Sequence, residues 1–161
     1  MSLSREAADR LAAARLWLVT PDAGTGDMPY LATAVYAMAP VVTDRVATLS
    51  VDVRWRLYVN EAWLLEADIP DVGRELAHLA LHLLADHAGR AQDLGVTRST
   101  SAAWAKAADA TVAELLDADG GGTSADHPLL PPVRLRLPAS RSAEEYFAVL
   151  SRLDASPSGG D

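Results

Sequence analysis

The segment RELAHLALHLLADHAGR, residues 74–90, is the feature that most limits what this chain can fold into. Its leucines and alanines recur three and four residues apart, which predicts an amphipathic helix over residues 70–89. His78 and His82 then lie one turn apart, and their directions around the helix differ by about 40°. Any fold of this chain must accommodate that helix together with its pair of imidazoles.

Two interpretations of the histidine pair are open at this level. The spacing lets two imidazoles hold one ion, as in zinc hydrolases with a His-x-x-x-His helix. The alternative is a pair of core or surface histidines that hold no ion. His87 lies about 140° from His82 around a straight helix, so a structural role near Arg90 is predicted for it.

A zinc site of the hydrolase type needs a third protein ligand, because it holds three protein groups and a water. Asp109 is the best candidate, since the residues around it, AKAADATVA, are small and apolar and a carboxylate there needs a partner. Glu75 is the rival, because Glu75-x-x-His78 is the ligand spacing of di-iron bundles. That architecture needs a second copy of the motif, and the sequence has none.

Composition narrows the class of protein. A length of 161 residues suits one domain with a real core. The absence of cysteine excludes disulfides and thiolate zinc sites, and a net charge of -8 disfavours a nucleic-acid partner. No signal peptide or apolar run of membrane-spanning length is present, so no membrane association and a cytoplasmic location are expected.

The remaining periodicity predicts an α+β fold, mostly helical with a small sheet beside the histidine helix. Strands are expected at residues 46–51 and 55–59. Ser4, Asn60 and Ser142 are predicted to begin helices. One domain is expected over residues 1–153, followed by a flexible tail at 154–161. The other helices are expected at residues 4–19, 29–40, 60–68, 99–119 (closed by Gly120–Gly122) and 142–153, whereas 123–138 is too rich in proline for regular structure.

Several stretches of the chain together resemble a known family. The segments HLALH, HAGR and WAKAAD correspond to a zincin-type HExxH, a further His and Arg, and a downstream WNxAxD helix. PYLATAVYAMAPV, TLSVDVRWRLYVNEAWL and SAEEYFAVLSRL fit as well. The chain thus resembles the metallopeptidase domain found beside von Willebrand factor A-like domains in bacteria, over residues 10–153.

The resemblance implies a minimal zincin-like domain and one zinc ion. It implies metal ligands at His78, His82 and Asp109. The groups expected to support this site are Glu75, His87, Arg90 and Trp104, of which the last three match family positions. The family context also implies a peptide or protein partner, such as a von Willebrand factor A-like protein or an AAA-type ATPase.

Two residues depart from the family pattern. Leu79 stands where the catalytic glutamate belongs, and Ala105 replaces the asparagine after the tryptophan. A general base at the first position contributes about 10² to 10⁴-fold to the rate, so no catalytic residue is assigned and ordinary peptidase activity is expected to be lost. A metal-binding interaction module is predicted, with an active hydrolase or a metal-free structural relic as alternatives. Substitute bases by residue type alone are Asp86, Glu144, Glu145 and Tyr146.

The remaining motifs carry weaker expectations. His127, in the proline-rich segment, is only a remote candidate ligand. The four tryptophans are expected to anchor the core or the sheet, because no basic groove accompanies them.

Overall fold

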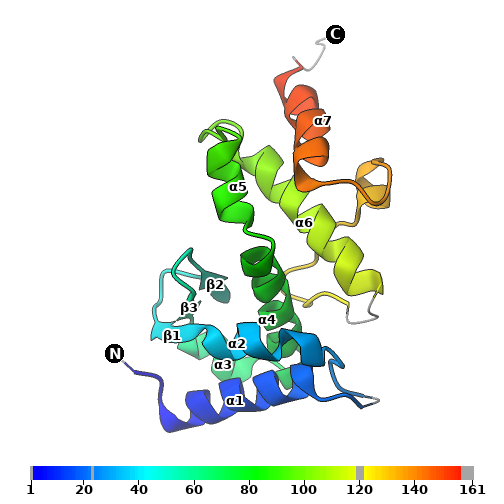
Figure 1. Cartoon of the computed structure of the whole chain (residues 1–161). Coiled ribbons are helices and arrows are strands. Elements are labelled where there is room, and N and C mark those ends of the chain that lie inside the picture. The colour runs from blue at the N-terminus through cyan, green and yellow to red at the C-terminus, as the bar shows by residue number, and fades with distance from the viewer. Residues whose placement is uncertain (1, 23, 119–121, 157–161) are drawn as a thin grey trace.

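A computed structural model describes residues 2–22, 24–118 and 122–156. The chain forms helices and one three-stranded sheet, which confirms the predicted α+β class (Figure 1). In chain order the elements are α1 (Arg5–Val19), η1 (Pro29–Leu31), α2 (Ala32–Ala37), β1 (Ala39–Val42), β2 (Leu49–Val51), β3 (Arg56–Val59), α3 (Glu61–Glu66), α4 (Ile69–Leu84), α5 (His87–Asp93), α6 (Ser101–Ala118), η2 (Pro132–Leu135) and α7 (Ala143–Ala155).

The three predicted N-caps are confirmed. The Ser4 hydroxyl accepts from the backbone of α1, and the Asn60 carbonyl oxygen accepts from that of α3. Ser142 and Glu145 form a reciprocal capping box at the start of α7. These caps depend on residues three positions apart, which is why the local sequence predicts them.

The sheet has the strand order β1-β3-β2, with β1 parallel and β2 antiparallel to β3. Strands β2 and β3 fall within the two predicted ranges, whereas β1 corrects the expectation of a helix over residues 29–40. The helix ends at Ala37 because the residue before a proline disfavours helical geometry. Pro40 pairs with Leu57 in a strand at the edge of the sheet, where a missing amide donor is tolerated.

Helix α4 lies in the middle of the molecule (Figure 1). On one side it packs against α1, α2 and β2, and on the other against α6. Gly73 allows the α1 contact to be close, because a Cβ at this position would overlap the Trp17 ring. A smaller cluster joins α6 to α7, formed by Ala103, Ala107, Ala110, Leu137, Tyr146 and Leu150.

The predicted helix over residues 70–89 is two helices in the structure. Asp86 has a φ of 51°, in the left-handed region, so the chain turns between α4 and α5. The Asp86 side chain accepts from the Gly89 amide and caps α5. A Cβ on Gly89 would overlap the Asp86 carboxylate, so this cap requires glycine. The turn changes the direction of the His87 side chain, which comes into contact with His82.

Helix α7 extends through Ala155, two residues into the expected tail. Residues 157–161, and the predicted helix closure at Gly120 and Gly121, lie outside the described residues. None of the described helices combines the length and the apolar character needed to cross a bilayer.

Candidate metal centre

Three of the predicted site residues meet between α4 and α6. His82 Nε2 lies 2.8 Å from His78 Nε2 and 2.9 Å from Asp109 Oδ1, and His78 Nε2 lies 3.2 Å from the same oxygen. Helical spacing brings the two histidines together, whereas Asp109 arrives only because α6 packs on α4. All three side chains therefore direct ligand atoms at one point.

The donor set fits one divalent ion. Metal–ligand bonds of 2.0–2.1 Å at tetrahedral angles would place the ligand atoms about 3.4 Å apart, a few tenths of an ångström more than the contacts in this structure. The Asp109 side chain is 30% exposed and that of His82 20%, so the meeting point is open to one side. Two imidazoles and a carboxylate are the ligands of many catalytic zinc sites. Ligation itself stays a prediction.

Asp109 is held in its ionised form. Burial raises the pKa of its carboxyl, but hydrogen bonds from His78 and His82 outweigh that effect and leave the pKa well below its usual range. A carboxylate that remains charged at neutral pH can act as a metal ligand without losing a proton first.

His87 contacts His82 at the ring nitrogen opposite to the one that faces His78 and Asp109. The Nδ1 atoms of the two rings are 2.8 Å apart, and His87 Nε2 is 3.4 Å from Thr111 Oγ1. Burial, followed by the charges of His82 and Arg90, lowers the pKa of His87 to about 4, so its ring is neutral. The straight-helix geometry predicted for His87 is wrong, because the turn at Asp86 brings the ring back to His82.

Arg90 joins α5 to α7. Its Nε and Nη2 atoms donate to the two carboxylate oxygens of Glu144 at 2.7 and 2.5 Å, and Nη1 donates to the Ala85 carbonyl. This pair lowers the pKa of Glu144 to about 2. Trp104 packs edge-on against His87, with ring centroids 6.2 Å apart. Arg90 and Trp104 thus hold the surroundings of His87 in place.

The three candidate ligands line a cavity of about 610 Å³. Its other walls are residues 50–53, the facing side of α4 and the start of α6. Leu79 belongs to this lining and is 8% exposed. Its apolar side chain offers no proton acceptor on this wall of the cavity.

Of the four substitute bases suggested by residue type, Asp86 alone lines this cavity, and its carboxylate already caps α5. Glu144 is paired with Arg90, and Glu145 completes the capping box of α7. The Tyr146 hydroxyl donates to the Pro138 carbonyl at 2.8 Å. The structure therefore gives each of these four groups a structural role.

His127 is the residue that sequence reasoning undervalued. It lines the same cavity, and its ring stands edge-on to His78 with centroids 4.8 Å apart. Its Nδ1 lies 3.1 Å from Oε1 of the buried Glu75. The partners are about fifty positions away along the chain, so no local pattern could have indicated this contact.

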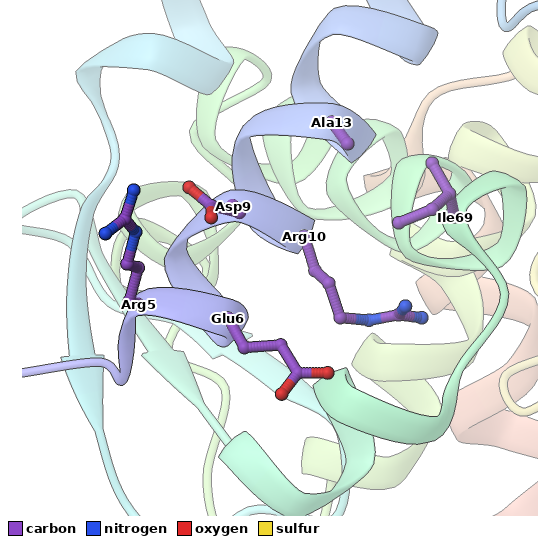
Figure 2. Close-up of a pocket in the computed structure, with 6 residues that line it drawn as sticks. All are labelled: Arg5, Glu6, Asp9, Arg10, Ala13 and Ile69. Carbon is purple, nitrogen blue, oxygen red and sulfur yellow. The ribbon is translucent and has the colours of Figure 1, made fainter.

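A second cavity, of about 590 Å³, lies beside α1 and is shown in Figure 2. Arg10, one of its lining residues, donates to the carbonyls of Leu64 and Ala67 at the end of α3. Neither Asp109 nor any histidine lines it. Of these two cavities, the one at α4 is lined by the three candidate ligands.

One comparison with known proteins gives a match. A protein-family model described as "Putative metallopeptidase domain" matches residues 7–160. No curated protein and no solved structure matches the chain.

Proposed function

The chain belongs to this metallopeptidase-domain family, and on that premise we propose that it is a zincin-like zinc protein without ordinary peptidase activity. Its role in this proposal is to bind a peptide or a protein segment at the cavity beside α4. The observation that carries the proposal is the convergence of His78, His82 and Asp109 on the wall of that cavity.

The donor set favours zinc. Two imidazoles and one carboxylate suit an ion of intermediate softness, and the chain has no cysteine thiolate that would select another metal. When bound, zinc would supply a Lewis-acidic position that can accept an oxygen or nitrogen of a ligand. His78 and His82 would hold the ion on one side, and Asp109 would hold it on another.

Loss of peptide hydrolysis follows from the groups around that position. Hydrolysis needs an acceptor for the proton of the attacking water, and Leu79 supplies none. Besides Asp109, the carboxylates lining the cavity are Asp52 and Asp86. Asp52 accepts from Arg56 and Tyr58, and Asp86 caps α5. Neither carboxylate is free to act as a base.

An extended peptide fits the walls of the cavity. Strand β2 lies at the edge of the sheet, and residues 50–53 face the cavity. An edge strand can pair its backbone groups with an added strand, and flanking side chains then select the sequence. Val53, which is 63% exposed, and Trp55 would contact apolar side chains of such a peptide.

Family context suggests where to look for the partner. A von Willebrand factor A-like protein or an AAA-type ATPase in the cytoplasm would present the segment in this proposal. The cavity would recognise that segment through its backbone and apolar side chains rather than through charge.

A second candidate function is an active hydrolase with a substitute base. It is favoured by His127, an imidazole in the cavity that is held by a buried carboxylate. Imidazole is the most common general base in enzymes, so this arrangement has the right chemistry.

The two functions are separated by one pair of measurements. Full-length protein prepared without chelator is dialysed against zinc and analysed for metal, and then incubated with a peptide library. The proposal expects bound zinc, loss of one equivalent in Asp109→Asn, and no chelator-sensitive cleavage. Zinc-dependent cleavage by the wild type would favour the hydrolase, and equal zinc contents of wild type and Asp109→Asn would refute the centre.

A further inference from the structure

Glu75 has a buried carboxyl side chain, and one of its two oxygens has no hydrogen-bond partner among the described residues. It projects from α4 and is 1% exposed. Its Oε1 accepts from the Thr48 hydroxyl at 3.3 Å and contacts His127 Nδ1. Its Oε2 is buried and has no hydrogen-bond partner among the described residues. An unpaired carboxylate oxygen is costly to bury, so this atom points to a missing cation or donor.

His78, one turn further along α4, also has a buried atom without a partner. Its Nε2 faces His82 and Asp109, whereas its Nδ1 is buried with no partner within the described part of the chain. Glu75 precedes His78 by three residues, so both side chains lie on one face of α4. Two buried ligand atoms without partners therefore occur at neighbouring positions of one helix.

His127 completes a second group of ligands. One ligand atom each from Glu75, His78 and His127 lies within 4.8 Å of the other two. The segment that carries His127 is attached to the helices beneath it: Trp63 Nε1 donates to Asp126 at 2.8 Å, and the Ala125 amide donates to Asp71. The side chain of His127 is 47% exposed, which leaves solvent access to the group.

We propose that Glu75, His78 and His127 hold a second divalent cation, at a position distinct from the one at His82 and Asp109. The ligands are a carboxylate and two imidazoles, which bind zinc and also cobalt, nickel or copper. The inference rests on the proposed function only in sharing His78 with that centre.

His78 then bridges the two ions. Its Nε2, which faces His82 and Asp109, would bind the first ion, and its buried Nδ1, which has no partner among the described residues, would be left for the second. A ring bound at both nitrogens would carry no N–H. The ring proton passes to solvent when the second ion binds. Metal binding at the second position therefore releases one proton from His78, which is measurable in a titration.

Charge favours a second cation. Each of the two ions has its own carboxylate, Asp109 for the first and Glu75 for the second, and the chain carries a net charge of -8. The negative field of the whole chain raises the local concentration of cations.

The test is the zinc content of the full chain after equilibrium dialysis, measured by elemental analysis. The wild type should bind two ions, and His127→Ala and Glu75→Gln should each bind one. Glu75→Gln keeps the size of the side chain, and His127 lies on the surface, so at least one variant should fold. Asp126→Asn is the matched control, because it changes the adjacent carboxylate and retains an acceptor for Trp63; it should still bind two.

A second readout is proton release. Calorimetric zinc titrations in two buffers of different ionisation enthalpy should show one fewer proton released by His127→Ala than by the wild type. The inference is overturned if His127→Ala and Glu75→Gln bind as many ions as the wild type. It is also overturned if the wild type binds one ion that Asp109→Asn and His127→Ala both abolish.

These outcomes separate the two proposals. If Asp109→Asn loses one equivalent of zinc while His127→Ala and Glu75→Gln both keep it, the first centre is supported and the second is refuted. If His127→Ala and Glu75→Gln each lose one equivalent while Asp109→Asn keeps it, the first centre alone is refuted.

Discussion

His87 Nδ1 lies 2.8 Å from His82 Nδ1, whereas His82 Nε2, at the far end of the same ring, lies 2.9 Å from Asp109 Oδ1. One imidazole is thus held at both nitrogens. A metal ligand whose second nitrogen is hydrogen-bonded has its ring orientation and tautomer fixed. The turn at Asp86 is what makes this contact, because it places His87 at the start of a new helix.

The first prediction is that His87→Ala weakens zinc binding about 10 to 100-fold, the usual effect of removing a group that orients a metal ligand. Competition against a chromogenic chelator measures the affinity. Thr111→Val is the control, because it removes the hydroxyl at the other end of the His87 ring, 3.4 Å away, and leaves the His82 contact intact. Equal affinities of His87→Ala and wild type would show that His87 does not orient His82.

The second prediction concerns the missing base. Leu79→Glu should place a carboxylate on the cavity wall and produce weak, chelator-sensitive peptide cleavage that the wild type lacks. A general base is worth about 10² to 10⁴-fold, and we expect the lower end because the orientation of the scissile bond can matter as much as the base. Cleavage of a peptide library, followed by mass spectrometry, is the assay.

Leu79→Gln is the matched control, since it has nearly the same size as glutamate and cannot accept the proton of a water. Cleavage by Leu79→Gln equal to that of Leu79→Glu would contradict the role assigned to this position. If the wild type and both variants fail to cleave any peptide, the proposal of a binding module is retained.

The third prediction is a pH dependence of stability. The pKa of Glu144 is lowered from 4.5 to about 2, first by the hydrogen bond from Arg90. A depressed folded pKa contributes stability above the unfolded value, and that contribution is lost as pH falls from about 4.5 towards 2. Glu144→Gln should therefore be less stable than the wild type at pH 7, by about 0.5 to 1 kcal/mol after screening of this part-exposed pair.

Urea unfolding at pH 7, 4 and 3 measures the difference. The gap between wild type and Glu144→Gln should narrow at each step, and 1 M salt at pH 7 should narrow it as well. A gap that is constant with pH would mean that packing, not the ion pair, makes the difference.

The fourth prediction tests the turn that positions His87. Gly89→Ala should destabilise the protein by about 0.5 to 2 kcal/mol, since the added Cβ displaces the Asp86 carboxylate from its capping position. Asp86→Ala removes the same cap. The double variant should lose less stability than the sum of the two single variants, because both remove one interaction. Additive losses in thermal unfolding would contradict this account of the turn.

Local rules predicted the parts of the structure that depend on neighbouring residues. The caps at Ser4, Asn60 and Ser142, and the spacing of His78 and His82, follow from residues three or four apart. Strand β1 was missed because Pro40 was interpreted as a helix stop, whereas its place at a sheet edge depends on pairing with β3. The continuous hydrophobic pattern of α4 likewise gave no sign of the left-handed residue at Asp86.

The sequence indicated some residues of the candidate site and missed others, for the same reason. Asp109 was predicted because an acid among small apolar residues needs a partner and because the family resemblance marked its position. His127 meets Glu75 across 52 positions of sequence, through a segment whose course is fixed by contacts such as Trp63 to Asp126. Contacts of that kind follow from tertiary packing, which single-sequence patterns do not encode.

The most direct test of the central claim is anomalous diffraction from crystals of the zinc-loaded protein, recorded on both sides of the zinc absorption edge. The account predicts a peak within about 2.0 to 2.2 Å of His78 Nε2, His82 Nε2 and Asp109 Oδ1, with one coordination position facing the cavity. Crystals in excess zinc that show no anomalous peak among these three side chains would contradict it.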